Sequence, residues 1–283
     1  MSEVDRLVFA GRNWQPSSIE RVTRVLDTST KPISVVTDDG AAIVKYMGNP
    51  QGSVALICEL IGTELANHIG LRTPDFAIMN IPALDLPGHP MSLVEPGPAF
   101  CSRWEEAVSL SPRSGLLQKL RNTEDLAKLV VLDTWTRNKD RFSDDGAAGY
   151  SVVNFDNVLL RRDKRLVELL VIDHTHAFVE TTLEDELGRD WVDEQTVYGL
   201  FGQFRPFLTR KFVDRALSAV KQIDLATVES ICDGVPRAWG MTQALSEVLS
   251  SCVVDRGKKL ENWLPSALFD QYEMDLVQEG GAK

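Results

Sequence analysis

The order of predicted strands and helices constrains the fold of this chain more than any other feature of its sequence. Three short runs of β-type composition come first, at 21–26, 33–37 and 42–47. Asp38, Asp39 and Gly40 separate the last two runs and are typical of a hairpin turn. Apolar residues then recur at helical spacing over 53–69, and another strand is predicted at 76–81. The first part of the chain is therefore expected to be β-rich with a single helix.

The remainder of the chain has a different pattern. A helix is predicted to begin near Thr123 and to contain the apolar run 126–132. The stretches 151–160 and 165–174 are typical of two strands joined by a polar turn, and helical spacing dominates from about Leu183 onward. The stretch 82–98, rich in Pro and Gly, is expected to connect the two parts. We therefore predict an α+β fold with two lobes, a small β-rich N-lobe at 1–95 and a larger, mainly helical C-lobe at 96–283.

Composition narrows the class of protein. The 283 residues are 43% apolar and 25% charged, as in ordinary globular proteins, and the net charge is −11. A chain this acidic does not favour general binding to nucleic acid or to anionic membranes, so neither is expected as a partner. The beginning of the chain lacks the pattern of a signal peptide, and no apolar run is long enough to span a membrane. The four cysteines are far apart, and we expect a cytoplasmic protein without disulfides.

Several polar residues stand where a purely structural role is not the only explanation. Asp140 lies in the dense cluster "TRNKDRF" directly after the apolar helix, either as an ordinary helix end or as a carboxylate presented by that helix. Lys45 lies inside the apolar strand "AIVKYM", where it must point to solvent or meet an anion. Glu59 lies on the apolar helix that follows and could pair with that lysine.

Two further residues complete a chemical inventory. Asp173 ends the apolar strand "LLVID", a position where a rigid scaffold often presents a catalytic or metal-binding carboxylate. Asn157 comes between the two acids, at the start of the preceding strand. In chain order, the sequence thus offers a strand lysine, a helix glutamate and the oxygen-bearing side chains of Asp140, Asn157 and Asp173. A phosphoryl-transfer site of the protein-kinase type uses this set of groups. Such a site needs a cation for the phosphates and acidic ligands for Mg²⁺.

Two segments of the sequence resemble a known family. The first reads "VVTDDGAAIVKYMGNPQG" and then "CELIGTELANHIGLRTPDFAI", and the second reads "NKDRF", "NFDNVLL" and "LLVIDHTHAF". Together they resemble the HipA-like kinases, which are distant relatives of protein kinases and phosphoinositide kinases. The resemblance covers about residues 22–178 and implies a kinase-like fold that uses ATP and Mg²⁺ to phosphorylate a Ser or Thr hydroxyl of a protein.

The resemblance also implies a role for each residue. Lys45 would bind the ATP phosphates with Glu59 as its partner, and Asp140 would be the catalytic acid. Asn157 and Asp173 would hold the metal, although the 157 − 140 = 17 positions after Asp140 exceed the usual gap and leave Asn154 as a rival ligand. Two other residues depart from the family pattern. These are Cys58, in place of an asparagine before Glu59, and Thr175, in place of a glycine after the "IDH" run.

No Gly-rich phosphate loop precedes Lys45, so another segment must cover the phosphates. The turn "DTSTK" offers the hydroxyls of Ser29 and Thr30 together with backbone N–H groups, and an ordinary polar turn is the alternative. Arg141 is expected to contact phosphate or Asp173, or else to make a surface ion pair. The pair His174 and His176 could suit zinc, but no further Cys or His stands at ligand spacing, and a supporting role beside Asp173 is the simpler interpretation.

The leading interpretation is a kinase with an unknown protein as its substrate. Two alternatives belong to other classes: a pseudokinase that binds nucleotide or a partner for regulation, and an unrelated α+β binding protein. Phosphate transfer from ATP distinguishes the first two, and a fold without two lobes would favour the third.

Overall fold

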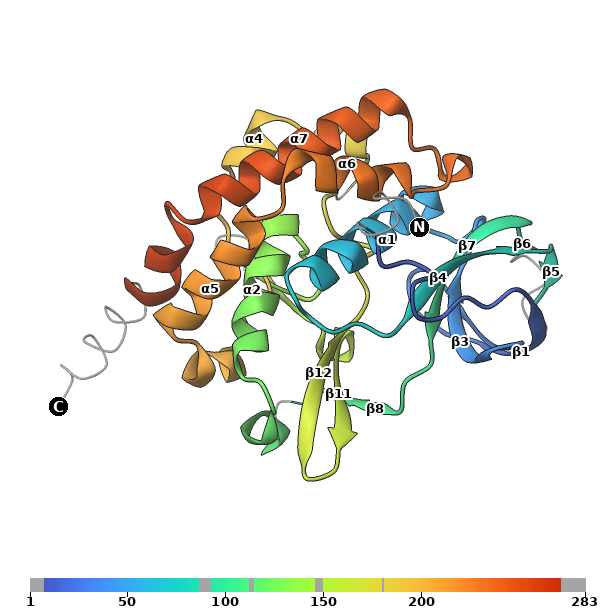
Figure 1. Ribbon diagram of the computed structural model, residues 1–283, viewed down its shortest axis with the longest axis horizontal. Helices are drawn as coiled ribbons and strands as arrows, with labels where there is room; N and C mark the ends of the chain where they lie inside the picture. The colour runs from blue at the N-terminus through green and yellow to red at the C-terminus, as the bar shows by residue number, and fades with distance from the viewer. Residues whose placement is uncertain (1–7, 87–92, 112–114, 146–149, 180, 271–283) are drawn as a thin grey trace.

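A computed structural model describes residues 8–86, 93–111, 115–145, 150–179 and 181–270 (Figure 1). The β-rich lobe contains an antiparallel sheet of five strands in the order β1-β2-β3-β7-β4. Its strands are β1 (Ile19–Val25), β2 (Ile33–Thr37), β3 (Gly40–Lys45), β4 (Phe76–Ile81) and β7 (Gly97–Arg103). A small pair, β5 (Leu84–Asp85) and β6 (Leu93–Val94), lies at its end.

The predicted hairpin around Asp38 and Asp39 is present. Thr37 pairs with Gly40, and Gly40 has a φ of 102°, which glycine adopts more readily than any other residue. The register places Ile33 opposite Val44, so the turn that joins β1 to β2 lies at the end of the sheet that carries Lys45. The inward residues of β2 and β3, such as Val35 and Val44, form a small core of their own with Trp14.

Helix α1 (Gly52–His68) lies between the sheet and the helices of the other lobe (Figure 1). It is buried almost all round, because β7 covers one side and α2 and α6 cover others. This explains why its apolar residues form a broad face rather than a narrow stripe. Glu59 and Glu64 are buried on it, and both require partners.

We propose that the chain crosses between the lobes at 104–106. Strand β7 still belongs to the N-lobe sheet, whereas β8 (Ala107–Ser109) joins β11 (Val158–Asp163) and β12 (Leu166–Val171) in a three-stranded sheet. We therefore propose that the connection is not the Pro/Gly-rich stretch 82–98, since its described residues form β5, β6 and the start of β7; residues 87–92 lie outside the described residues. Strand β7 pairs with β3 and β4 of the N-lobe sheet as far as Arg103, so we propose that the lobe boundary lies after this residue.

The second lobe is built on helices. Helix α2 (Glu124–Thr136) is buried among the other helices, and Arg137 caps its C-terminus in the left-handed conformation with a φ of 54°. A two-stranded ladder follows, of β9 (Phe142–Asp145) and β10 (Tyr150–Val153). The longer helices are α5 (Arg210–Lys221), α6 (Leu225–Asp233) and α7 (Gln243–Leu260). Short helical turns complete it: η2 (Gly115–Lys119), η3 (Phe155–Asn157), α3 (Leu183–Glu186), α4 (Arg189–Asp193), η4 (Gly202–Phe207) and η5 (Arg237–Trp239).

The main core runs through the helical lobe and includes α1. All four cysteines are buried thiols without a disulfide, as predicted. Among the described residues, no helix combines the length and the apolar character needed to cross a bilayer. The mixed architecture and the two-lobed arrangement match the predicted α+β fold.

Candidate active site

Lys45 is held between two carboxylates from distant parts of the chain. Its Nζ lies 3.0 Å from Glu59 Oε2 of α1 and 2.9 Å from Asp173 Oδ1, which follows β12. Because Lys45 ends β3 and is only 8% exposed, its ammonium group cannot reach bulk water freely. Burial disfavours the charged form, but Asp173 and Glu59 outweigh that effect and raise the pKa of Lys45. The lysine that the sequence singled out is thus a buried cation at the junction of the lobes.

Asp173 is strongly ionised. Burial acts to raise the pKa of its carboxyl, but Lys45 and the hydroxyl of Thr175 outweigh burial and hold that pKa well below its usual range. Thr175 Oγ1 donates a hydrogen bond of 2.7 Å to Asp173 Oδ1. The positive φ angles in this segment fall on Asp173, at 61°, and on Phe178, at 69°. Thr175 needs no such angle, so replacing the family's glycine there introduces no backbone strain and adds a hydrogen bond.

Glu59 connects the helix to the loop after Asp173. Its Oε2 accepts a hydrogen bond of 2.7 Å from the backbone N–H of His174 and also forms the ion pair with Lys45. Gly62, one turn further along α1, packs against His174, and a Cβ at Gly62 would lie only 2.5 Å from that of His174. His174 is fully buried, and neither ring nitrogen has a hydrogen-bond partner in the described parts of the chain. Burial lowers the pKa of His174 well below its usual value, so the ring is neutral.

Asp140 lies at the end of the loop that follows α2. Its Oδ2 accepts hydrogen bonds from Asn157 Nδ2 at 2.9 Å and from Asn154 Nδ2 at 3.2 Å. The two asparagines differ in their oxygens, since Asn154 Oδ1 accepts the backbone N–H of Asp156 at 3.2 Å. Among the described residues, Asn157 Oδ1 makes no comparable capping bond, which leaves that oxygen better suited to a metal. The geometry thus favours Asn157 over Asn154 as a cation ligand.

Arg141 makes its hydrogen bonds inside the protein and, among the described residues, forms no surface ion pair, and its contact with phosphate stays a prediction. Its side chain is fully buried, with Nε donating to Asp133 Oδ2 at 2.8 Å. Its Nη1 donates to the backbone carbonyls of Asn157 and of Ile172, the latter at 2.9 Å. Through Nη1 the buried guanidinium joins the backbone of Asn157 to the backbone next to Asp173, while Nη2 has no hydrogen-bond partner among the described residues.

Asp133 is the residue that sequence reasoning missed. It is completely buried, and burial raises the pKa of its carboxyl to about 6 although Arg141 opposes the shift. Gly199, with a φ of 71°, lies so close that a Cβ would stand 2.4 Å from Asp133 Oδ2. The only sequence signal was an acid that interrupts an apolar helix, which by itself is more often a helix-surface residue.

Within the part of the chain that the structure describes, no hydrogen bond or ion pair joins the remaining predicted residues, which are Ser29, Thr30 and Cys58, to the Lys45–Asp173 pair. Ser29 is exposed in the β1–β2 turn, whereas Thr30 is buried, and the role of either hydroxyl in phosphate binding stays a prediction. Cys58 is buried in the core, where burial raises the pKa of its thiol. Across the described residues, no group of three or more His, Cys, Asp or Glu side chains is arranged to hold a metal, and zinc at the His174–His176 pair gains no support.

A small hollow lies next to Asp140. It has a volume of about 220 Å³ and is lined by Lys139, Asp140, Val152, His176 and Val179. His176 Nε2 also lies 3.2 Å from Gln51 Nε2, at the N-cap of α1, so the two lobes touch at this point. The hollow gives a ligand access to the Asp140 carboxylate from the side of the C-lobe.

Fold and site together define a two-lobed, kinase-like protein. The chain belongs to the HipA-like kinase family, whose sequence model matches residues 19–261. That match confirms the resemblance seen in the two sequence segments. No curated protein matches the sequence.

A solved kinase structure shows the same fold. The proinflammatory kinase CtkA of Helicobacter pylori superposes with a TM-score of 0.57 at 14% identity, over 90% of this chain and 96% of its own. HipA of Shewanella oneidensis MR-1, solved with HipB and operator DNA, matches with a TM-score of 0.44 at 10% identity, over 95% of this chain and 73% of its own. Family and fold support a kinase-like phosphotransferase.

Proposed function

We propose that this protein is a kinase that transfers the γ-phosphate of ATP to a Ser or Thr hydroxyl of a protein. The observation that carries the proposal is the position of Lys45 between Glu59 and Asp173. A buried ammonium beside an ionised carboxylate provides both charges that a bound triphosphate and its metal require. When nucleotide binds, the α- and β-phosphates are expected to take over the contact that Asp173 now makes with Lys45, while Glu59 keeps the ammonium in place.

The path of the nucleotide follows from strand register. Lys45 pairs with Phe100 and Ala42 with Arg103, so three residues of β3, about 10 Å, separate the lysine from the crossing segment 104–106. That length suits the distance between the phosphates and the base of ATP. A hollow of about 880 Å³ adjoins this segment and is lined in part by Trp104, Val108 and Leu160. We propose that the adenine ring lies along this segment.

Mg²⁺ fits the residues present. Asp173 is ionised, Asn157 has an oxygen to offer, and Mg²⁺ usually takes one or two protein ligands and completes its shell with phosphate oxygens and water. Asp173 and Asn157 would therefore hold it, and the ion would neutralise charge on the β- and γ-phosphates.

Asp140 is proposed to orient the acceptor. Its carboxylate borders the hollow of about 220 Å³, and the two asparagine amides fix its orientation. The acceptor oxygen forms a bond to the γ-phosphorus as the bond to the β-phosphate oxygen breaks, and the hydroxyl proton passes to Asp140. ADP leaves with the bonding electrons of the broken P–O bond.

The test is phosphate transfer from γ-labelled ATP in the presence of Mg²⁺, to the protein itself and to mixed protein substrates. Wild type should transfer label, and Asp140→Ala should lower the rate by about 10²–10⁴-fold. Equal labelling by the two proteins would exclude Asp140 from the chemistry. Nucleotide binding without transfer by wild type would favour the pseudokinase alternative.

A further inference from the structure

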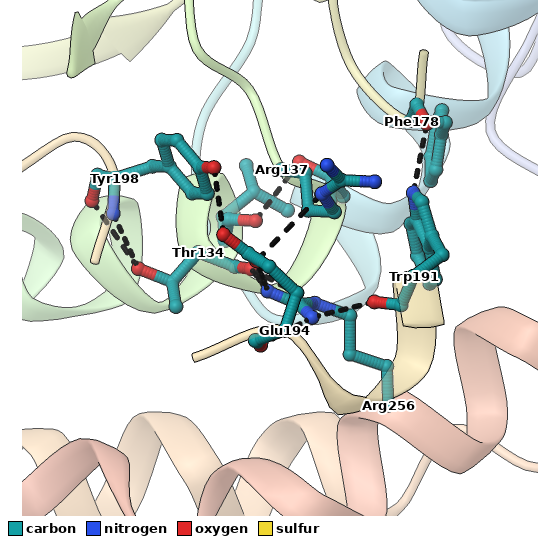
Figure 2. A network of polar contacts seen from close by, with 9 residues as sticks. Thr134, Arg137, Phe178, Trp191, Glu194, Tyr198 and Arg256 are labelled. Atoms are coloured by element: carbon teal, nitrogen blue, oxygen red, sulfur yellow. Dashed lines mark hydrogen bonds and ion pairs between the residues drawn. The ribbon is translucent and has the colours of Figure 1, made fainter. Parts of the chain in front are cut away.

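Arg256 is a buried arginine whose hydrogen bonds all go to the protein interior. It lies on α7 and is 1% exposed, far along the chain from every residue of the proposed site. Figure 2 shows its guanidinium between the end of α2 and the segment that contains Trp191 and Glu194. The donors Nε and Nη2 reach the carbonyl of Thr134 at 3.2 and 2.9 Å. Nη1 reaches the carbonyls of Trp191 and Glu194, both at 2.7 Å, and Nη2 also reaches Glu194 Oε2 at 2.8 Å.

One side of this network fixes the end of α2. The last carbonyls of a helix have no partner within the helix, and Arg256 supplies one for Thr134. The Thr134 hydroxyl also exchanges hydrogen bonds of 3.2 and 3.1 Å with the backbone of Tyr198. The helix ends two residues later, at Thr136, and after Arg137 the chain leads to Asp140. The position of Asp140 therefore depends on where this helix end is held.

The other side fixes the segment that leaves Asp173. Trp191 Nε1 donates to the carbonyl of Phe178 at 2.8 Å, and the Phe178 N–H donates to the carbonyl of Thr136 at 2.6 Å. Phe178 stands only five positions after Asp173. The Phe178–Thr136 hydrogen bond joins the segment after Asp173 directly to the end of α2. Because Arg256 binds the carbonyls of both Trp191 and Thr134, its guanidinium provides a second connection between them (Figure 2).

Glu194 links Arg256 to the residue that follows α2. Its carboxylate accepts from Arg256 and from the Tyr198 hydroxyl, the latter at 2.9 Å, and lies 3.6 Å from Arg137 Nε. Arg137 is the left-handed residue that caps α2, so Glu194 contacts both the helix end and the residue that turns the chain toward Asp140. The charges of the two arginines hold the carboxylate ionised: burial acts to raise the pKa of Glu194, but hydrogen bonds and these arginines outweigh it and lower that pKa.

We propose that Arg256 is a positioning residue that sets the placement of the Asp140 carboxylate relative to the Asp173 carboxylate. The inference rests on the proposed function, since it assigns those two carboxylates to one reaction. A planar fork with five N–H donors can join three carbonyls and a carboxylate from two segments, whereas the three donors of lysine leave some of these acceptors unpaired. A small misplacement of reacting groups is costly to the rate even when the substrate still binds.

The test uses Arg256→Lys, which keeps the charge and loses the fork. We expect kcat for phosphate transfer to fall about 10- to 100-fold, with KM for ATP changed less than about threefold, because Lys45 and the nucleotide path are untouched. The matched control is Val253→Ala, one turn earlier on α7, where the side chain is equally buried and has no part in the network. Its Tm should fall by a similar amount while kcat stays within about twofold of wild type.

Hydrogen exchange provides a readout that does not depend on activity. In Arg256→Lys, the amides of 137–142 and 173–179 should both exchange faster than in wild type, and in Val253→Ala neither segment should change. The inference is overturned if kcat falls equally in both variants, or if exchange in the two segments stays at the wild-type rate. Should wild type transfer no phosphate, the proposed function fails, and the exchange result alone decides whether Arg256 holds the two loops.

Discussion

Lys45 Nζ and Asp173 Oδ1 lie 2.9 Å apart although 128 positions separate the two residues in the chain. This contact joins the last residue of an N-lobe strand to the residue that follows a C-lobe strand. Each group stabilises the charged form of the other in a place where burial alone would neutralise both. Replacing either partner leaves an unpaired buried charge, which is costly in any protein.

Lys45→Met should abolish most phosphate transfer. Without the ammonium, the phosphates lose their cation and the carboxylates of Glu59 and Asp173 face each other unpaired, so we expect at least a 10²-fold lower kcat/KM and a lower Tm. Label transfer from γ-labelled ATP measures the first effect and thermal unfolding the second. Lys221→Met removes an exposed lysine paired with Glu261 and should leave both values close to wild type.

Asn157→Ala and Asn154→Ala should differ in their dependence on Mg²⁺. Both lose a hydrogen bond to Asp140, but only Asn157 has an oxygen suited to the metal. We expect the Mg²⁺ concentration for half-maximal activity to rise about 10-fold or more in Asn157→Ala and to change little in Asn154→Ala. The assignment is reversed if the shift appears in Asn154→Ala instead.

Gly62→Ala should disturb the Asp173 loop from the face of α1 that also carries Glu59. An added Cβ meets His174 at 2.5 Å, so the loop must move or the helix must shift, at a cost of about 1–3 kcal/mol. The expected outcome is a lower free energy of unfolding in urea together with reduced phosphate transfer. Gly202→Ala, where an added Cβ meets nothing within 4 Å, should be close to neutral. A fully active Gly62→Ala protein would show that the loop tolerates displacement.

Glu64 should make stability depend on pH. Its carboxylate accepts the N–H groups of Phe9 and Ala10, and burial raises its pKa to about 7 from the usual 4.5. Between these two values the folded state holds a proton that the unfolded chain has lost, so stability falls as pH rises from about 4.5 to about 7 and is level above that. The shift of about 7 − 4.5 = 2.5 corresponds to roughly 3 kcal/mol.

Glu64→Gln removes this dependence and keeps one acceptor oxygen, which at the position of Oε1 still accepts the N–H groups of Phe9 and Ala10. Urea unfolding of wild type and Glu64→Gln at several pH values from 4.5 to 8 isolates the contribution of this one carboxyl from those of other acids. As pH rises from about 4.5 to about 7, the free energy of unfolding of the variant should increase by about 2–3 kcal/mol relative to that of wild type. Two parallel curves would mean that Glu64 titrates normally in the folded protein.

Local chemistry made much of the fold predictable from sequence. The hairpin at Asp38–Gly40, the strand 76–81 and the helix that contains Glu59 follow from turn residues and apolar periodicity, which act over a few neighbours. The prediction of one strand at 151–160 was less accurate, because this stretch contains the end of β10, the turn η3 and the start of β11. The polar residues Asn154 and Asp156 turn the chain there through a local hydrogen bond.

The sequence by itself determined which chemical groups are available: a lysine in an apolar strand, a glutamate on an apolar helix and carboxylates at the ends of a helix and a strand. Only the tertiary structure decided which of them meet. Lys45 reaches Asp173, whereas Arg141 turns inward to Asp133, and Arg256 joins Thr134 to Trp191, which lies 191 − 134 = 57 positions further along the chain. Such pairings depend on how the lobes pack and on which polar groups burial leaves in need of a partner, and no spacing along the chain encodes either.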